Sequence, residues 1–141
     1  MKRIFLFLFA AALLASCEKE TILPEHNLPG EIVTFVNTHF PENPVVQAVK
    51  EKDDFELSYK VILNGGFVLE FNRKKEITDI DGGTKLPDSV VPSSILSYVA
   101  TQFPDQYIIG WERDSRSQQV TLVNGIELDF SMNGEFLRID S

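Results

Sequence analysis

The segment LPGEIVTFVNTHFP, residues 28–41, returns 63 residues later as VPSSILSYVATQFP, residues 91–104. Six of the fourteen positions are identical, and most of the others keep their chemical class. A second match closes each copy, where Phe71, Glu76, Ile80 and Asp81 correspond to Phe130, Glu135, Ile139 and Asp140. The sequence therefore predicts a tandem duplication, with repeats at about 28–83 and 91–141.

Both copies of the segment have the spacing of a short amphipathic helix. Pro29 and Pro92 suit the first turn, where a missing N–H has no intrahelical acceptor to lose. Mostly apolar residues then recur at i, i+3, i+4 and i+7, as they do on one face of a helix. Pro41 and Pro104 end the helices, because the residue before a proline is disfavoured in the α region. We expect two short helices, each with one face to bury.

The residues after each helix alternate as strands do, and Asn-Gly pairs separate them as hairpin turns. In the first copy the expected strands are 45–49, 55–63, 67–71 and 77–80, with the turn Asn64-Gly65-Gly66. In the second copy they are 108–111, 120–123, 126–130 and 136–139, with the turn Asn124-Gly125. The predicted fold class is therefore α+β: a tandem duplication of a helix plus a three- to four-stranded antiparallel meander, with the helices packed on one face of the sheet. The other face is left for solvent or a partner.

The N-terminal residues have the pattern of a lipoprotein leader. Lys2 and Arg3 precede an apolar run at 4–14, which is too short to span a bilayer. Leu14-Ala15-Ser16-Cys17 resembles a bacterial lipobox, so we expect a signal peptide at 1–16, lipid attachment at Cys17, a flexible tether at 17–27 and the folded domain at 28–141. The alternatives are an ordinary secretory signal and an uncleaved anchor.

Charge restricts the partners that the protein can have. The formal net charge is −8, and it becomes −10 when Lys2 and Arg3 leave with the leader. Nucleic acid is a poor partner for such a chain, because its affinity for proteins depends on Lys and Arg side chains. Anionic lipid headgroups repel the domain as well, so the membrane contact is expected through the lipid alone.

The helix segments, the Asn-Gly hairpins, the closing Ile-Asp strands and the lipobox together resemble the PepSY-like (beta-lactamase-inhibitor-like) family of Bacteroidetes envelope lipoproteins. The resemblance covers about residues 28–141, and its motifs are structural. It implies a non-catalytic domain that binds or restrains another envelope protein through its open sheet. It brings no catalytic residues with it.

The search for catalytic chemistry finds no constellation. Cys17 is the one cysteine, His26 lies in the expected tether, and His39 is replaced by Gln102 in the second copy. A serine triad needs a positioned histidine and zinc needs several His or Cys ligands. Asp79-Ile80-Asp81-Gly82 resembles the start of a calcium loop, although the end of a strand before a Gly-Gly turn explains it as well. We expect no catalytic residue, no metal site and no cofactor.

The difference between the two copies suggests a partner-binding site. Tyr107 and Trp111 stand where the first copy has Pro44 and Ala48, and Arg113 follows them. Aromatic side chains dominate interface energies when a partner buries them. The alternative is that Trp111 fills the core at the junction between the copies.

These observations predict a lipid-anchored, non-enzymatic protein of the cell envelope that acts as a protein-binding module, with inhibition of an unidentified envelope protein as one form of that role. The domain would lie in the periplasm or at the cell surface, with the outer membrane as the expected anchoring site. A small-molecule or metal-ion binding or sensing lipoprotein is the alternative. An enzyme that uses scattered carboxylates is a third interpretation.

Overall fold

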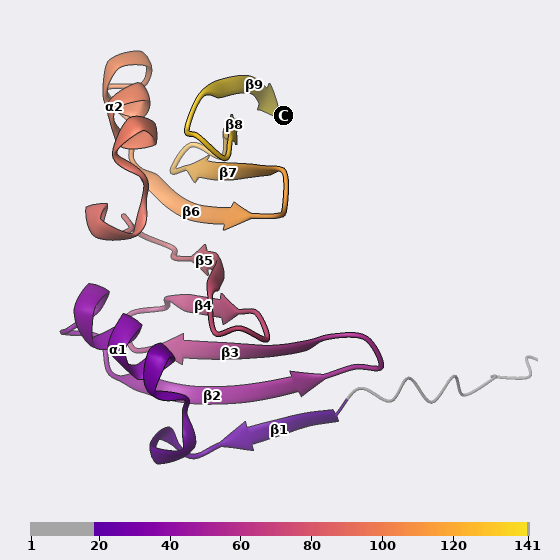
Figure 1. The fold of residues 1–141 in the computed structure, drawn as a ribbon. Coiled ribbons are helices and arrows are strands. Elements are labelled where there is room, and N and C mark those ends of the chain that lie inside the picture. Colours follow the sequence, from indigo (N-terminus) through magenta and orange to yellow (C-terminus); the bar gives the residue numbers. More distant parts are fainter. Residues whose placement is uncertain (1–18, 141) are drawn as a thin grey trace, which may run out of the picture.

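The computed structural model describes residues 19–140, which form nine strands, two α-helices and two short 3-10 helices (Figure 1). The lipobox and Cys17 lie outside these residues. In chain order the elements are β1 (Lys19–Leu23), η1 (Glu25–Asn27), α1 (Gly30–His39), β2 (Val45–Lys52), β3 (Leu57–Leu63), β4 (Val68–Phe71), β5 (Ile77–Asp81), η2 (Asp88–Val90), α2 (Ser93–Gln102), β6 (Ile108–Arg113), β7 (Ser117–Leu122), β8 (Glu127–Ser131) and β9 (Phe136–Asp140).

All nine strands belong to one antiparallel sheet in which each strand pairs with its neighbours in the sequence, from β1 to β9. The predicted fold class is wrong: the fold is a single, mostly β architecture with two ten-residue helices, and not a tandem α+β arrangement of two meanders. The pairing of β5 with β6 causes the difference, with Ile80 opposite Trp111. The unpaired edges of two separate meanders would expose peptide groups that one continuous sheet satisfies.

The two helices form where the proline pattern predicts them, at Gly30–His39 and Ser93–Gln102. Pro29 and Pro92 stand at the N-cap of each helix, one position earlier than expected. At the other end the N–H of Phe40 donates to the Val36 carbonyl at 2.7 Å, and Phe103 makes the equivalent bond to Val99 at 2.8 Å. Each helix therefore has the expected length.

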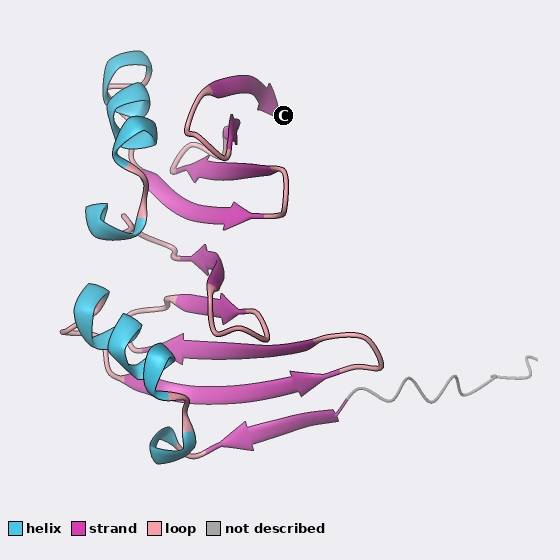
Figure 2. Ribbon diagram, viewed as in Figure 1, coloured by secondary structure: helices cyan, strands magenta, loops and turns pink. Residues whose placement is uncertain are grey.

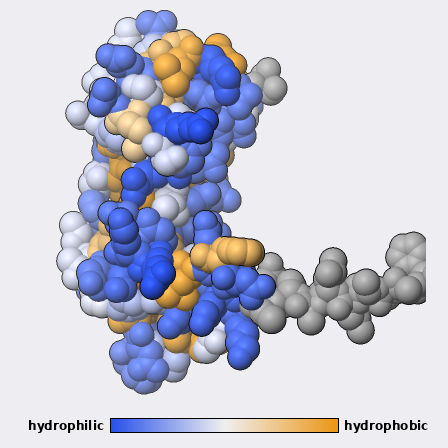
Figure 3. Space-filling model, turned by 45° about the vertical axis from the view of Figure 1, so that its right-hand side comes forward, coloured by the Kyte–Doolittle hydropathy of each residue, from blue (hydrophilic) through white to orange (hydrophobic). Residues whose placement is uncertain are grey.

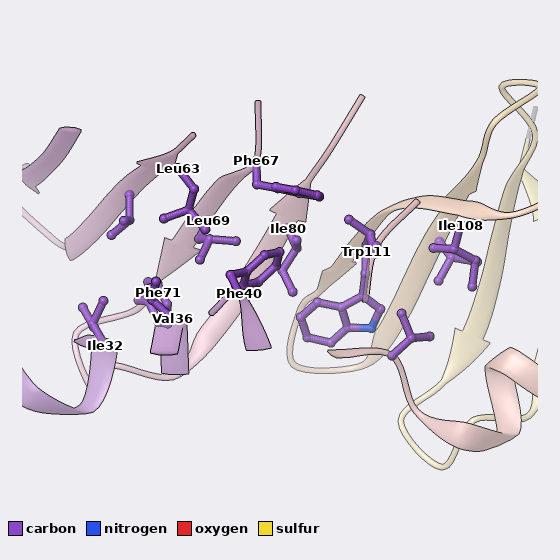
Figure 4. Close-up of a cluster of buried hydrophobic side chains, with 14 of the residues drawn as sticks. Ile32, Val36, Phe40, Leu63, Phe67, Leu69, Phe71, Ile80, Ile108 and Trp111 are labelled. Carbon is purple, nitrogen blue, oxygen red and sulfur yellow. The ribbon is translucent and has the colours of Figure 1, made fainter. Parts of the chain in front are cut away.

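The core lies between the sheet and the two helices, which run along the same side of the sheet (Figure 2). Ile32 and Ile95 have no exposed surface, and each lies in the buried cluster with the strand residues of its half. Figure 4 shows that this cluster continues from Phe67 and Ile80 to Trp111 and Ile108. One core therefore runs the length of the sheet.

The segment that we expected to be a tether differs from that expectation. Lys19–Leu23 forms β1, which pairs with β2 and places Leu23 opposite the buried Ala48. The physical reason is the free edge of β2, since an eight-residue strand would leave a long row of peptide groups unpaired.

Candidate functional site

The face of the sheet opposite the helices is the candidate site. Side chains alternate between the two faces of a strand. In β3, Tyr59, Val61 and Leu63 are buried toward the helices, whereas Lys60 and Ile62 point to the other side and are half-buried. Within the described residues, no helix covers this second face, which we call the uncovered face.

One row of side chains crosses the uncovered face from edge to edge, with one residue from every strand. Residues that are paired across neighbouring strands lie on the same face. In order from β1 to β9 the row is Ile22, Val49, Lys60, Glu70, Asp79, Glu112, Gln119, Asp129 and Arg138. Three carboxylates therefore stand on consecutive strands at the centre of the sheet.

A second row runs beside the first and adds more carboxylates. In order from β4 to β9 it consists of Val68, Asp81, Gly110, Thr121, Glu127 and Asp140. Gly110 has no side chain, and it leaves a shallow hollow between Asp81, Glu112 and Glu127. We call the carboxylates of the two rows the acidic strip: Glu70, Asp79, Asp81, Glu112, Glu127, Asp129 and Asp140.

The centre of the acidic strip is electrostatically unfavourable for the protein alone. Partial burial and, to a smaller extent, the neighbouring charges of Glu70, Glu112 and Asp81 together raise the pKa of Asp79 to about 6, while Lys60 opposes the shift. Like charges directly opposite each other destabilise a sheet. A cation that reached this place would relieve the repulsion.

At the β8–β9 end of the strip the charges are paired within the protein. Arg138 Nε donates to Asp129 Oδ2 at 2.7 Å, and Gln119 Nε2 donates to Asp129 Oδ1 at 2.8 Å. Gln119 Nε2 also lies 3.2 Å from Asp140 Oδ2. Among the described residues, the strip carboxylates without an ion pair include Glu70, Asp79, Asp81 and Glu112 on β4, β5 and β6, and Glu127 on β8.

The strip is not a preformed metal centre. Among residues 19–140 no group of three or more His, Cys, Asp or Glu side chains is arranged to hold a metal ion. The segment Asp79-Ile80-Asp81-Gly82 is the end of β5 and the turn that follows, so the strand interpretation of this segment is confirmed.

The structure separates the three residues that the sequence suggested as a partner site. Trp111 is 7% exposed and lies in the core at the β5–β6 junction, which is the alternative role given above. Tyr107 is 40% exposed and precedes β6. Arg113 at the far end of β6 donates from Nε to the Ile77 carbonyl at 3.0 Å. Tyr107 and Arg113 are about 20 Å apart along the strand, at roughly 3.3 Å per residue. The binding role of these residues stays a prediction, and they do not form one surface.

Sequence reasoning missed the acidic strip, although a signal for it is present. Asp79 and Asp81 alternate with the apolar Ile80, and Glu127 and Asp129 alternate with Leu128. Such alternation marks the polar side of a half-buried strand. What it does not give is the register that brings the carboxylates of β4, β5 and β6 side by side.

Two further observations concern the class of protein. Within residues 19–140 the two α-helices are ten residues each, and neither is long and apolar enough to cross a membrane. The fold is a curved antiparallel sheet with two helices on one side and a carboxylate-lined face on the other.

Comparison with known proteins places this architecture in a family. A family model described as "putative beta-lactamase-inhibitor-like, PepSY-like" matches residues 14–58 and 57–138. The chain belongs to this PepSY-like family, as the resemblance of its motifs implied. No curated protein matches the sequence.

Solved structures of Bacteroides proteins share the fold. A putative periplasmic protein of the DUF2874 family from Bacteroides vulgatus is 38% identical, with a TM-score of 0.81 over 87% of this chain and 98% of its own. A protein from Bacteroides thetaiotaomicron, described as a putative calcium-regulated periplasmic protein, is 30% identical, with a TM-score of 0.83 over 86% of this chain and 97% of its own. A putative periplasmic protein of unknown function from Bacteroides vulgatus is 30% identical, with a TM-score of 0.81 over 87% and 100%.

Proposed function

We propose that this protein is a non-enzymatic binding protein of the bacterial cell envelope, and that it recognises a positively charged protein surface with the uncovered face of its sheet. The observation that carries the proposal is the acidic strip, in which Glu70, Asp79 and Glu112 stand on consecutive strands without a described cationic partner except Lys60 at one end. Charge complementarity gives specificity and speeds association.

The flanks of the strip suit a protein partner better than a small ion alone. Ile22, Val49 and Ile62 lie beside the strip on the β1–β3 part of the same face. An apolar area next to a charged one is the usual composition of an interface, in which desolvated contacts supply affinity and charges supply orientation. The partner is therefore a surface with Lys or Arg side chains next to an apolar group.

The location in the envelope is supported by the leader and by the relatives. The apolar run at 4–14 and the lipobox ending at Cys17 are the pattern of an exported lipoprotein. The solved relatives are described as periplasmic proteins. We infer that the lipid on Cys17 holds the domain at a membrane surface, with the outer membrane as the proposed site.

The test uses a pair of variants that change the charge equally on the two faces. Glu70→Gln/Glu112→Gln neutralises the centre of the strip, and Glu31→Gln/Glu42→Gln neutralises two exposed carboxylates in and after α1. Parent and variants are immobilised and exposed to native envelope extract, and the retained protein is identified and purified. We expect its affinity to fall at least about tenfold for the strip variant and to fall with rising salt, as a charged interface should.

The control variant should bind as the parent does. Equal binding by the strip variant, or turnover of a substrate by the purified protein, would contradict the proposal. We expect the strip variant to fold as the parent does, because the Gln side chains remove like-charge repulsion around Asp79. Melting temperatures of the three proteins check this point.

A second candidate function is calcium binding on the same strip. It is favoured by carboxylate oxygens, which are the ligands that calcium prefers, and by the relative described as calcium-regulated. Calcium binding to the folded chain would raise its melting temperature. If this function holds, millimolar CaCl₂ should raise the melting temperature of the parent. The same CaCl₂ concentration should leave the melting temperature of Asp79→Asn/Glu112→Gln unchanged. An unchanged melting temperature in the parent would exclude it.

A further inference from the structure

β9 is an edge strand of the sheet, and all five of its residues are exposed. In β5, the matching strand of the first half, only Asp81 is exposed. Among residues 19–140 β9 pairs with β8 alone, whereas the strands from β2 to β8 each pair on both sides. Phe136 is 37% exposed, Leu137 55% and Ile139 53%. β9 lies at the top of the molecule in Figure 1, and Figure 3 shows an apolar area at the same end. An unpaired edge of this kind is a template for another strand.

β5 is the strand of the first half that corresponds to β9, and it has a neighbouring strand on both sides. The two strands have matching pairs with the preceding strand: Leu69–Ile80 matches Leu128–Ile139, and Phe71–Ile77 matches Phe130–Phe136. β6 lies on the outer side of β5, and Ile80 is 1% exposed there. Ile139 in the matching position is 53% exposed. A strand on the outer side of β9 would cover Ile139 as β6 covers Ile80.

The bulge in β9 does not protect this edge. Bulges often prevent pairing at sheet edges, because they twist the edge strand away. The register between β8 and β9 shifts at Asp129/Phe130. The register between β4 and β5 shifts at the matching place, Glu70/Phe71, and β5 still pairs with β6. A strand with this bulge can therefore accept a neighbour.

The peptide groups of Ile139 are in the right position to pair. In an antiparallel ladder, alternate residues direct both N–H and C=O to the same neighbouring strand. The N–H of Gly82 donates to the Ile109 carbonyl of β6 at 2.8 Å, so Ile80, two residues earlier, also faces β6. Because Ile139 matches Ile80 in its register with the preceding strand, its N–H and C=O face away from β8.

We propose that β9 pairs with β9 of a second copy of this chain, antiparallel and about a two-fold axis through Ile139. In this register the two Ile139 side chains are opposite each other on the helix side of the sheet. Arg138 of each copy is opposite Asp140 of the other, on the uncovered face, and this pair occurs twice because of the two-fold symmetry. Opposite charges directly across two strands stabilise their pairing.

Two other arrangements of β9 differ from this dimer in charge or in symmetry. A two-fold axis through Arg138 would place two guanidinium groups opposite each other, which destabilises pairing. Pairing of β9 with β1 of the next copy would be head-to-tail, so it would give a ring or an open filament and not a two-fold dimer. The dimer about Ile139 joins two sheets into one and continues the uncovered face across both copies. It does not depend on the function proposed for the acidic strip.

Sedimentation velocity of the chain from Glu18 to Ser141 tests the dimer. This sample is suitable, because the solved relatives match 86–87% of this chain over 97–100% of their own chains. The proposed interface consists of one short strand from each copy, and interfaces below roughly 1,200 Å² are weak. The concentration series therefore extends to about 1 mM. We expect a reversible monomer–dimer equilibrium, and an increase of at least about tenfold in its Kd for Ile139→Lys.

Two sets of variants make the result specific. Ile22→Lys introduces the same charge at the 69% exposed Ile22 of the opposite edge strand, and it should dimerise as the parent does. Asp140→Arg should weaken the dimer, because it places an arginine opposite Arg138 of the other copy, while the ion pair between Arg138 and Asp129 within each copy is kept. Melting temperatures confirm that each variant is folded.

Three outcomes would overturn the proposal. If the parent chain stays monomeric over the whole concentration series, β9 does not pair with a second copy, and the partner of this edge would be a strand of another protein. A dimer that Ile139→Lys does not weaken is formed elsewhere. Species larger than a dimer that Ile22→Lys also abolishes would show head-to-tail pairing of β9 with β1.

Discussion

Ile80 of β5 lies directly opposite Trp111 of β6, and this pair joins the two halves of the sheet. The side chains are 1% and 7% exposed. Trp111 Nε1 donates to Gln118 Oε1 at 3.0 Å, so the indole is buried with its N–H satisfied. The continuity of the core therefore depends on one large aromatic side chain at the junction.

Replacement of Trp111 should destabilise the whole chain. We expect Trp111→Ala to lower the free energy of unfolding by about 3–5 kcal/mol, which is the usual effect of removing a buried aromatic side chain. Trp111→Phe should lower it less, although it leaves Gln118 Oε1 without its donor. Urea unfolding measures both, and Tyr107→Ala, at a 40% exposed position, is the control with an effect within about 0.5 kcal/mol. Equal stability of Trp111→Ala and the control would contradict the role of the junction.

The raised pKa of Asp79 predicts how stability depends on pH. The folded-state pKa is about 6 and the ordinary value is 3.8, so the folded chain binds the proton more tightly than the unfolded chain does. Stability should therefore fall as the pH rises from 4 to 6 and the carboxylate becomes charged among Glu70 and Glu112.

A neutral side chain at this position should remove the effect. We expect Asp79→Asn to raise the free energy of unfolding at pH 7 by roughly 1 kcal/mol, after allowance for solvent screening of a half-buried group, and to leave it unchanged near pH 4. Urea unfolding at the two pH values measures the difference. An equal change at both would show that packing, and not charge, is responsible.

Two glycines in turns allow the effect of backbone conformation on stability to be distinguished from the effect of side-chain packing. Gly125 and Gly134 both have positive φ, at 90° and 83°. A Cβ on Gly125 would meet no atom within 4 Å, whereas one on Gly134 would collide with Ser94 of α2. Gly125→Ala should therefore lower the free energy of unfolding by about 1 kcal/mol, through conformation alone. Gly134→Ala should lower it further, because the Ser94 hydroxyl must rotate away and the Cβ of Ser94 would lie at a tight 3.0 Å.

The control for this comparison removes the obstructing hydroxyl. Gly134→Ala/Ser94→Ala should recover part of the additional loss seen in Gly134→Ala. Thermal unfolding of the three variants measures the differences. If Gly125→Ala and Gly134→Ala are equally stable, the hairpin between β8 and β9 does not pack on α2 as described.

The sequence was sufficient to predict the local elements. The proline pattern at Pro29 and Pro41 predicted α1, and the same pattern predicted α2, because these signals act within a few residues. The hairpin turns at Asn64-Gly65 and Asn124-Gly125 were predicted for the same reason, and both glycines have positive φ.

The relationships between distant strands could not be predicted in this way. Alternation shows that Ile80 and Trp111 are on strands, but it does not show that the strands pair, and this pairing turns two expected meanders into one sheet. The same limit hid the acidic strip, since Glu70, Asp79 and Glu112 come together only through the register of three strands. For the same reason β1 was not predicted, because its short segment forms a strand by pairing with the edge of β2.

The most direct test of the proposed function is carbodiimide cross-linking of the chain to its partner in native envelope extract. The reagent joins a carboxylate to a lysine amine as an amide only where the two are in ionic contact, and peptide mapping locates the bond. We expect cross-links at Glu70, Glu112 or Glu127 on the uncovered face. Cross-links confined to the helix side, at Glu31, Glu42 or Asp88, would contradict it.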